Sequence, residues 1–201
     1  IINFSDSNTQ LFSVLLNQKL FKRLKLELIK SKFFNYKMNM DYKNILKEDY
    51  RLIINCDFNH EVTKKFFSKT LKKNYYSIAY TTILEHKKLQ SNDTAIQIFT
   101  NQGPIAFLPI SNNKTSIVYS HRINKNKKKI DINNLIKKFN PKYEINKVNK
   151  ISSIELKSFK LRKYFVNNIL SFGDLLHKVH PLAGQGFNMS IRDIKYLIEL
   201  I

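Results

Sequence analysis

The 201-residue chain has a single cysteine, Cys56, and no tryptophan. One cysteine cannot form a disulfide within the chain, so a reducing compartment is the default expectation. Cys56 ends an apolar stretch at residues 51–56, and we expect its thiol to be an inert core group. No apolar run reaches the ~20 residues that a membrane-spanning helix requires. Residues 1–4 also lack the basic and then apolar pattern of a signal peptide, and we expect a cytoplasmic protein.

Acidic residues are also scarce. The chain has 15 of them and 35 lysines and arginines, so its formal net charge is +20. Such an excess suits nucleic acid or an anionic membrane surface. Lysine supplies almost all of this charge along the whole chain, whereas proteins that read base edges favour the planar guanidinium of arginine. We therefore expect no nucleic-acid partner. Attraction to anionic lipid stays open, and the lysine-rich run at residues 124–129 is either a solvated loop or such a contact.

Apolar patterning predicts several regular elements. Residues 9–32 have the spacing of an amphipathic helix, and the runs at residues 51–56 and 165–172 are typical of buried parallel strands. Between those runs the β-rich segments are residues 75–84, 95–100, 105–110 and 116–120. Turn signals separate them, which indicates an antiparallel sheet. A short helix is expected at residues 133–139 and a longer one from Phe187 onward.

This order predicts an α/β (α+β) fold in which one domain is interrupted by another. One buried strand ends at Asp57 and a second at Gly173-Asp174, with the antiparallel sheet between them. The simplest arrangement is a Rossmann-like domain that the chain leaves and re-enters. The expected segments are residues 1–60, 61–165 and 166–201.

The residues that most clearly suit a ligand-binding site lie at 173–193. A buried strand delivers Asp174 to the carboxyl end of a sheet, where α/β proteins bind ligands, and a carboxylate there can accept hydrogen bonds from sugar-like hydroxyls. Gly184 and Gly186 allow the backbone to approach a flat ligand closely. The helix that follows presents unpaired N–H groups and about half a positive charge at its N-terminus, which suits an electron-rich carbonyl.

The order of residues in this segment resembles the second FAD motif of the class A flavin monooxygenases. Its stretch His-Pro-Leu-Ala-Gly-Gln-Gly is most similar to the UbiH/UbiF group, which hydroxylates the ring of ubiquinone precursors. A weaker similarity links residues 103–110, Gly-Pro-Ile-Ala-Phe-Leu-Pro-Ile, to a strand of that group's substrate domain. The resemblance implies a Rossmann-like FAD-binding domain interrupted by an antiparallel β-sheet substrate domain.

By this resemblance FAD is the cofactor, with Asp174 at its ribityl chain or a nearby phosphate and Pro181 along the flavin. The implied FAD-binding residues are Asp57, Asp174, Pro181, Leu182, Ala183, Gly184, Gln185, Gly186, Phe187 and Asn188. The residues implied to line the aromatic substrate are Phe107, Leu108 and Pro109. In the family NADH or NADPH reduces the flavin, and O2 then forms a flavin hydroperoxide that hydroxylates the ring. The cofactor supplies that chemistry, so no catalytic side chain is assigned.

The resemblance also implies partners and a place of action. A prenylated phenol and O2 would be the substrates. Association with a ubiquinone-biosynthesis complex or with the inner face of the membrane stays open. His177 and His180 are three residues apart, but no cysteine or acidic cluster completes a metal site, so we expect no metal.

Two features depart from the family pattern. None of the four glycines forms the G-x-G-x-x-G that holds the FAD pyrophosphate, so we expect the chain to be an internal part of a longer protein. In the middle motif after Asp57, the family has Gly, Ser and Arg where this chain has Phe58, Glu61 and Lys64. Phe58 fills space that a backbone should enter, and Glu61 would repel a phosphate, which weakens the case for a nicotinamide co-substrate. A non-catalytic remnant, another FAD-dependent aromatic hydroxylase and a prenyl reductase remain alternatives.

Overall fold

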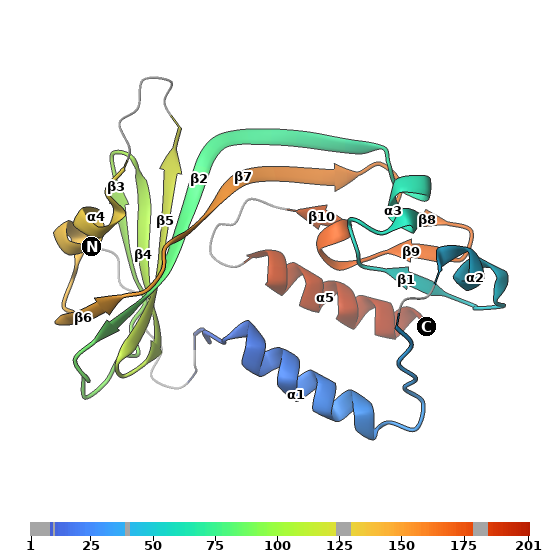
Figure 1. Cartoon of the computed structure of the whole chain (residues 1–201), viewed down its shortest axis with the longest axis horizontal. Helices are drawn as coiled ribbons and strands as arrows, with labels where there is room; N and C mark the ends of the chain where they lie inside the picture. The colour runs from blue at the N-terminus through green and yellow to red at the C-terminus, as the bar shows by residue number, and fades with distance from the viewer. Residues whose placement is uncertain (1–8, 10, 39–40, 124–129, 179–184) are drawn as a thin grey trace. The chain divides into compact units, whose positions relative to one another are not determined.

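The computed structural model describes residues 9, 11–38, 41–123, 130–178 and 185–201. Contacts between residues divide the chain into two compact units. The first unit comprises Ile1–Tyr36, Ala79–His121 and Lys128–Ser153, and the second comprises Lys37–Ile78, Arg122–Lys127 and Ile154–Ile201. Two strands, β2 (Thr70–His86) and β7 (Ser152–Leu161), contribute residues to both units (Figure 1).

The first unit is built on the antiparallel sheet that the sequence predicts. Its further strands are β3 (Ile96–Thr100), β4 (Gly103–Ser111), β5 (Lys114–Arg122) and β6 (Ile145–Val148). The order of neighbours is β2-β5-β4-β3, and β6 also pairs with β2. Because successive side chains of a strand point to opposite faces, Phe107 of β4 and Ile117 of β5 are buried on one face. The predicted short helix, α4 (Ile132–Phe139), joins this core through Ile132 and Ile136.

A chain of buried hydrogen bonds ties these strands to the loops beside them. His86 Nδ1 lies 2.9 Å from the carbonyl oxygen of Lys87, so this nitrogen carries the proton and donates. His86 Nε2 therefore accepts from the Thr115 hydroxyl at 3.0 Å. Thr115 Oγ1 accepts from Asn92 Nδ2 at 3.0 Å, and the Tyr143 hydroxyl donates to Asn92 Oδ1 at 3.1 Å. Each of these four buried side chains thus has a partner, and the network fixes β2, β5 and two loops together.

The second unit contains the predicted parallel pairing (Figure 1). β1 (Ile53–Asn55) runs parallel to β9 (Ile169–Ser171), with Ile53 opposite Ile169 and Asn55 opposite Ser171. Ile169 is 1% exposed, whereas Ile54 is 46% exposed. The prediction that residues 51–56 form a buried strand is therefore wrong for one of its faces, the face on which Ile54 is exposed.

The single strand predicted at residues 165–172 is a hairpin. β8 (Phe165–Val166) pairs antiparallel with β9, and Val166 lies opposite Ile169. Asn167 adopts a φ of +53°, a left-handed conformation that asparagine tolerates better than most residues and that turns the chain between the two strands. The second strand ends at Ser171, two residues before Gly173.

The remaining elements of the second unit surround this small sheet. They are α2 (Tyr42–Lys47), α3 (Glu61–Phe66), the 3₁₀ turn η1 (Gly173–Leu175), β10 (His177–Lys178) and α5 (Gln185–Leu200). Their buried core consists of Val62, Phe67, Leu161, Ile169 and Leu175. The long helix predicted from Phe187 onward is confirmed as α5. The first unit and this one together give the predicted α/β fold with an antiparallel sheet.

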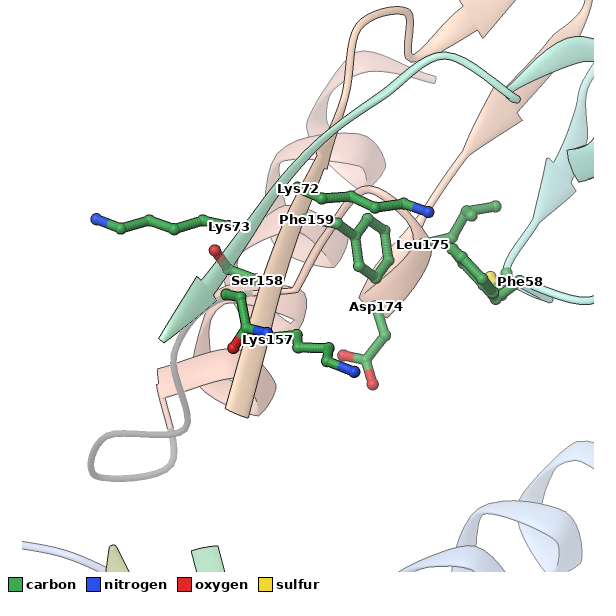
Figure 2. A pocket seen from close by; sticks show the side chains of 10 residues that line it. Phe58, Lys72, Lys73, Lys157, Ser158, Phe159, Asp174 and Leu175 are labelled. Carbon is green, nitrogen blue, oxygen red and sulfur yellow. The ribbon is translucent and has the colours of Figure 1, made fainter. Parts of the chain in front are cut away.

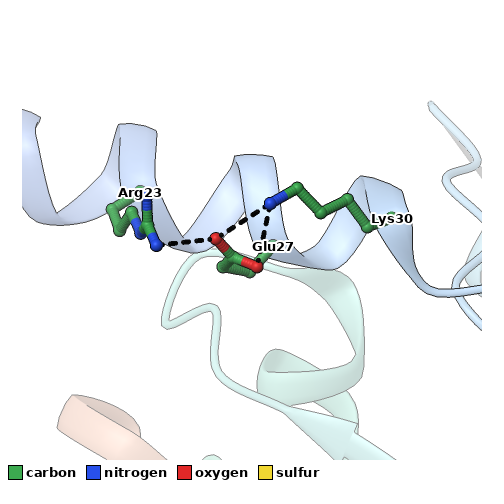
Figure 3. A network of polar contacts seen from close by, with 3 residues as sticks. All are labelled: Arg23, Glu27 and Lys30. Carbon is green, nitrogen blue, oxygen red and sulfur yellow. Dashed lines mark hydrogen bonds and ion pairs between the residues drawn. The ribbon is translucent and has the colours of Figure 1, made fainter.

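α1 (Asn17–Lys30) is the amphipathic helix predicted over residues 9–32, and it begins eight residues later than expected. None of its residues is buried. Arg23 and Lys30 both form ion pairs with Glu27, at 3.0 and 3.2 Å (Figure 3). Pairs exposed to this extent contribute little to stability. Among the described residues, no helix is long and apolar enough to cross a bilayer.

Replacing Thr115 by valine should destabilise the first unit, because the valine keeps the shape but leaves His86 Nε2 and one Asn92 N–H without partners. We expect the free energy of unfolding to fall by about 1–3 kcal/mol, measured by urea denaturation and circular dichroism. Thr81→Val is the matched control, since Thr81 is a half-buried residue of β2. Equal losses in the two variants would contradict a specific role for the network.

Candidate functional site

The parallel pairing of β1 with β9 brings together two segments that are distant in the sequence. Asn55 and Ser171, opposite each other, are the last residues of their strands. The Phe172 N–H donates to the Asn55 carbonyl oxygen at 3.0 Å, so the segments stay joined beyond the last pair. Asp57 and Asp174 follow shortly after, at the carboxyl ends of parallel strands, which is where α/β folds place ligands.

The loop after β1 is held in place by its own side chains. Asn55 Nδ2 donates to Thr63 Oγ1 at 2.7 Å, and the Thr63 hydroxyl donates to the Asp57 carbonyl oxygen at 2.6 Å. Asn55 Oδ1 accepts from the Asp57 N–H at 3.3 Å. One carboxylate oxygen of Asp57 accepts from the Asn59 N–H at 2.8 Å. Asp57 is thus engaged in shaping this loop.

A pocket of about 660 Å³ lies in the second unit (Figure 2). Four segments line it: the loop after β1, the early part of β2, the later part of β7, and η1. Phe58, Phe159 and Leu175 form its apolar side. The rings of Phe58 and Phe159 are 5.0 Å apart between centroids and tilted by 51°. Phe58 is still 47% exposed, so the pair offers aromatic surface to a ligand.

The polar side of the pocket carries a net positive charge. Lys72, Lys73 and Lys157 line it, and Asp174 is the one carboxylate among the lining residues. Figure 2 shows Lys72 reaching across Phe159, while Lys73 points away from that ring. Charges gathered in a concave site attract an oppositely charged ligand more strongly than scattered ones do.

Cys56 also lines this pocket, and its side chain is exposed. The prediction of a core thiol is therefore wrong. Asn55 takes the buried position at the end of β1, where its side chain bonds to Thr63, and the next residue must point to the other face. Desolvation by the surrounding atoms nevertheless raises the pKa of the Cys56 thiol.

The residues predicted to bind FAD fall into three groups. Asp174 lies in η1 and lines the pocket with an exposed carboxylate, and Asp57 lies in the neighbouring loop. Gln185, Gly186, Phe187 and Asn188 form the first turn of α5, an element in contact with η1. Pro181, Leu182, Ala183 and Gly184 are outside the described residues. The roles assigned to all of them remain predictions.

The residues predicted to line the substrate lie in the first unit and do not share a face. Phe107 is fully buried, with its ring 5.9 Å from that of Tyr143, and Pro109 is buried on the same side of β4. Leu108 points to the opposite face, where it is half-buried. Ala106 and its cross-strand partner Val118 share that face. The face of β4 and β5 that carries Ala106, Leu108 and Val118 is called the open face here. Of the three residues predicted to line the substrate, Leu108 is therefore the one that a ligand on the open face could contact.

Sequence reasoning missed the contribution of β2 and β7 to the pocket. Lys157 and Phe159 are two residues apart in β7 and so share a face. The segment 152–161 lacks the alternation that marks a strand in a sequence, since its two buried residues, Leu156 and Leu161, are five positions apart and fall on opposite faces. The lysine pair at 72–73 looked like part of the general charge excess.

The chemistry of the lining residues fits FAD, which combines an aromatic ring system, a chain of hydroxyls and a diphosphate. Phe58 and Phe159 offer surfaces for a ring. Asp174 offers a carboxylate that accepts from hydroxyls. Lys72 and Lys157 offer positive charge for a phosphate.

Comparisons with known proteins agree with this chemistry. Residues 56–201 match the family model described as the FAD binding domain. The ubiquinone biosynthesis monooxygenase COQ6 of Danio rerio is 27% identical over 192 residues, which cover 75% of this chain and 40% of that protein. The 3-demethoxyubiquinol 3-hydroxylase of Escherichia coli (strain K12) is 30% identical over 119 residues, 54% of this chain and 29% of that protein. The chain thus spans well under half the length of these relatives.

Solved structures support the fold. The chain matches RebC-10x with a TM-score of 0.55 and 13% identity, covering 70% of this chain and 29% of that one. It also matches the myxobacterial chondrochloren halogenase CndH, a variant of FAD-dependent halogenases, with a TM-score of 0.54 and 14% identity, covering 70% and 36%. At such low identity these matches show the architecture alone.

Cys56 offers a direct test of the pocket, because it is the only thiol in the sequence. Its raised pKa leaves less of the reactive thiolate at pH 8 than an ordinary cysteine has, so we expect iodoacetamide to modify the folded chain several-fold more slowly than the chain in urea. The rate should keep rising as the pH passes the pKa of an unperturbed thiol. Mass spectrometry of the alkylated protein measures both rates, and equal rates in the folded and unfolded chain would contradict the desolvated environment.

Proposed function

The chain belongs to the FAD-binding domain family, and from this we propose that it is part of an FAD-dependent monooxygenase that hydroxylates the aromatic ring of a prenylated phenol in ubiquinone biosynthesis. The observation that carries the proposal is that Asp174, Phe159 and Lys72 line one pocket. The β1–β9 pairing places Asp174 there beside the loop after β1, and the neighbouring strands β7 and β2 supply Phe159 and Lys72. The names of the relatives, monooxygenases and hydroxylases of ubiquinone biosynthesis, support the choice of reaction. NADH or NADPH would supply the electrons and O2 the oxygen atom.

Within this proposal, each part of the chain has a task. Asp174 would accept hydrogen bonds from the ribityl hydroxyls of FAD. The N–H groups of the first turn of α5, at Gly186 to Asn188, would lie at the pyrimidine edge, because a helix N-terminus favours an electron-rich carbonyl. Bound FAD supplies the redox chemistry that activates O2. The protein then has to orient the ring and keep water from it, and the apolar side of the pocket with Phe159 and Leu175 suits that task.

The substrate side belongs, in this proposal, to the antiparallel sheet. The open face of β4 and β5, with Ala106, Leu108 and Val118, offers small and apolar side chains to a prenylated ring. Residues 61–165, apart from the stretches of β2 and β7 that line the pocket, would form the substrate domain, and residues 1–60 and 166–201 the FAD-binding part. Phe107 and Pro109 would support this face from the core side.

Peripheral attachment to a membrane is part of the same proposal. A prenylated phenol partitions into lipid, and a protein with a formal charge of +20 is attracted to anionic lipid by roughly 1 kcal/mol for each lysine near the surface. The inner face of the membrane, reached from the cytoplasm, would be the place where enzyme and substrate meet.

A flavin-binding protein without hydroxylase activity is the second candidate. The observation that favours it is the ring of Phe58, which lines the pocket at the position where the resembled family has glycine. Such a protein would bind FAD without forming a hydroxylated product, whereas a functional hydroxylase would bind FAD and form the product.

Asp174→Asn should weaken FAD binding, because the neutral amide is a poorer acceptor for ribityl hydroxyls than the carboxylate. We expect a loss of affinity of about tenfold, measured by flavin absorbance and titration of the whole protein. Asp49→Asn is the control, since Asp49 is an exposed carboxylate that does not line the pocket.

The unchanged protein should also consume O2 and NADH or NADPH in the presence of a prenylated phenol and yield the hydroxylated ring, identified by mass spectrometry. Absence of flavin from the whole protein, even after reconstitution with FAD, would overturn the proposed function. Flavin without hydroxylated product would favour the second candidate.

A further inference from the structure

We propose that the outer edge of β3 pairs with the same strand of a second copy of this chain, so that the antiparallel sheets of the two copies join into one. β3 is the end strand of its sheet, and among the strands that the structure describes it pairs with β4 alone. An end strand presents a row of backbone N–H and C=O groups, which is a template for another strand. The inference concerns assembly and is independent of the proposed reaction.

The turn between β3 and β4 determines which backbone groups point outward. Thr100 and Gly103 are paired across a two-residue turn, so they form a hydrogen-bonded pair. Hydrogen-bonded and non-hydrogen-bonded pairs alternate along an antiparallel ladder. The N–H and C=O groups of Phe99 and Gln97 therefore point away from β4. Pro104 agrees with this pattern, because it lies opposite Phe99 and has no N–H to donate to β3.

β3 lacks the features that usually protect an end strand from pairing. Its sequence, Ile-Gln-Ile-Phe-Thr, contains no charged residue and no proline, and its pairing with β4 has no bulge. Residues 94–113 as a whole carry no charge, although 25% of the residues in the chain are charged. Phe99 is 79% exposed on this strand. Such an edge favours the addition of another strand.

A second copy fits this edge because the strand is complementary to itself. Two identical strands paired antiparallel have two-fold symmetry, which is the commonest symmetry of homodimers. Two copies with a formal net charge of +20 repel each other, and the repulsion is smallest where neither contributes charged residues. The uncharged segment 94–113 is therefore where two copies can approach most closely, whereas an acidic partner would be attracted to the lysine-rich parts of the chain.

One register satisfies the outward groups of both strands. With Gln97 opposite Phe99 of the second copy, two hydrogen-bonded pairs form, and Ile98 lies opposite Ile98 of the second copy. The two Phe99 rings then lie on the same face, at the diagonal spacing that aromatic side chains can bridge. Gln97 is the partner of Ala106 in β4, so this face is the open face, and the dimer would extend it. Because the contact is small, we expect a Kd on the order of 10–100 µM.

Sedimentation velocity of the full chain, at concentrations below and above this Kd, tests the association. We expect a monomer–dimer equilibrium. Raising the salt concentration should tighten the dimer several-fold, because salt screens the repulsion between two basic copies. A chain that stays monomeric at high salt and at concentrations well above the expected Kd would overturn the inference. So would a dimer that weakens with salt, since ion pairs would then hold it.

Two substitutions test whether β3 forms the contact. Gln97→Pro removes an outward N–H and leaves the hydrogen bonds between β3 and β4 intact, so it should weaken the dimer about tenfold or more. Phe99→Lys places a positive charge beside the two-fold axis in both copies and should have a similar effect. Leu71→Lys is the control, because Leu71 is an exposed residue of β2 and the change in charge is the same. Circular dichroism checks that each variant is folded.

Cross-linking tests the register. In a Cys56→Ser background, Ile98→Cys should give a disulfide-linked dimer on mild oxidation, because Cα atoms in a directly opposed non-hydrogen-bonded pair lie within disulfide range. Thr100→Cys is the control. Its thiol would lie four residues along the strand from that of the second copy, so it should not cross-link. A dimer that survives both β3 substitutions, or equal cross-linking of the two cysteine variants, contradicts the proposed pairing.

Discussion

The second unit depends on the parallel pairing of β1 with β9. Only three residues of each strand take part, Ile53–Asn55 and Ile169–Ser171, yet the pairing fixes where the loop after β1 and the turn η1 begin. So short a ladder is marginal by itself. The core around Ile169, with Val62, Phe67 and Leu175, supports it by burying the side chains that follow each strand. The pairing and the apolar core together therefore place the loop after β1 beside η1, although more than half of the chain separates these two segments.

The sequence predicts those parts of the fold in which one physical signal is strong. Apolar runs around Ile53 and Ile169 indicated parallel strands, and turn signals near Gly103 indicated the antiparallel sheet, because side-chain period and turn chemistry act locally. The hairpin at Asn167 was missed because residues 165–172 were interpreted as one apolar strand, although Asn167-Asn168 interrupts the apolar residues and asparagine favours a turn. Cys56 was misplaced for a related reason: the buried position went to a polar neighbour, Asn55, whose partner Thr63 lies beyond the loop.

The candidate site was predictable only where it lies in a compact motif. Asp174 could be found because it follows a buried strand directly. Lys72, Lys157 and Phe159 could not, because their proximity arises from neighbouring strands that each belong to both units. For Leu108 the sequence identifies the strand but not the face to which the side chain points. The sequence marks its strand as apolar, but whether Leu108 or Phe107 faces a ligand depends on which side α4 covers, and that is a property of tertiary packing.

The changes in the middle motif alter the pocket without harming the fold that carries it. Phe58 meets Phe159 instead of displacing backbone, so the added ring extends an aromatic surface. Glu61 lies in the first turn of α3, and Lys64 in its last turn. A negative charge at a helix N-terminus and a positive one at its C-terminus each stabilise a helix by about 0.3–1 kcal/mol, and a helix of six residues benefits from both. Glu61, which would repel a phosphate at this loop, thus stabilises the helix that follows the loop. The lysines that line the pocket lie instead on β2 and β7, the strands beside this loop, so the positive charge of the pocket does not depend on the altered motif.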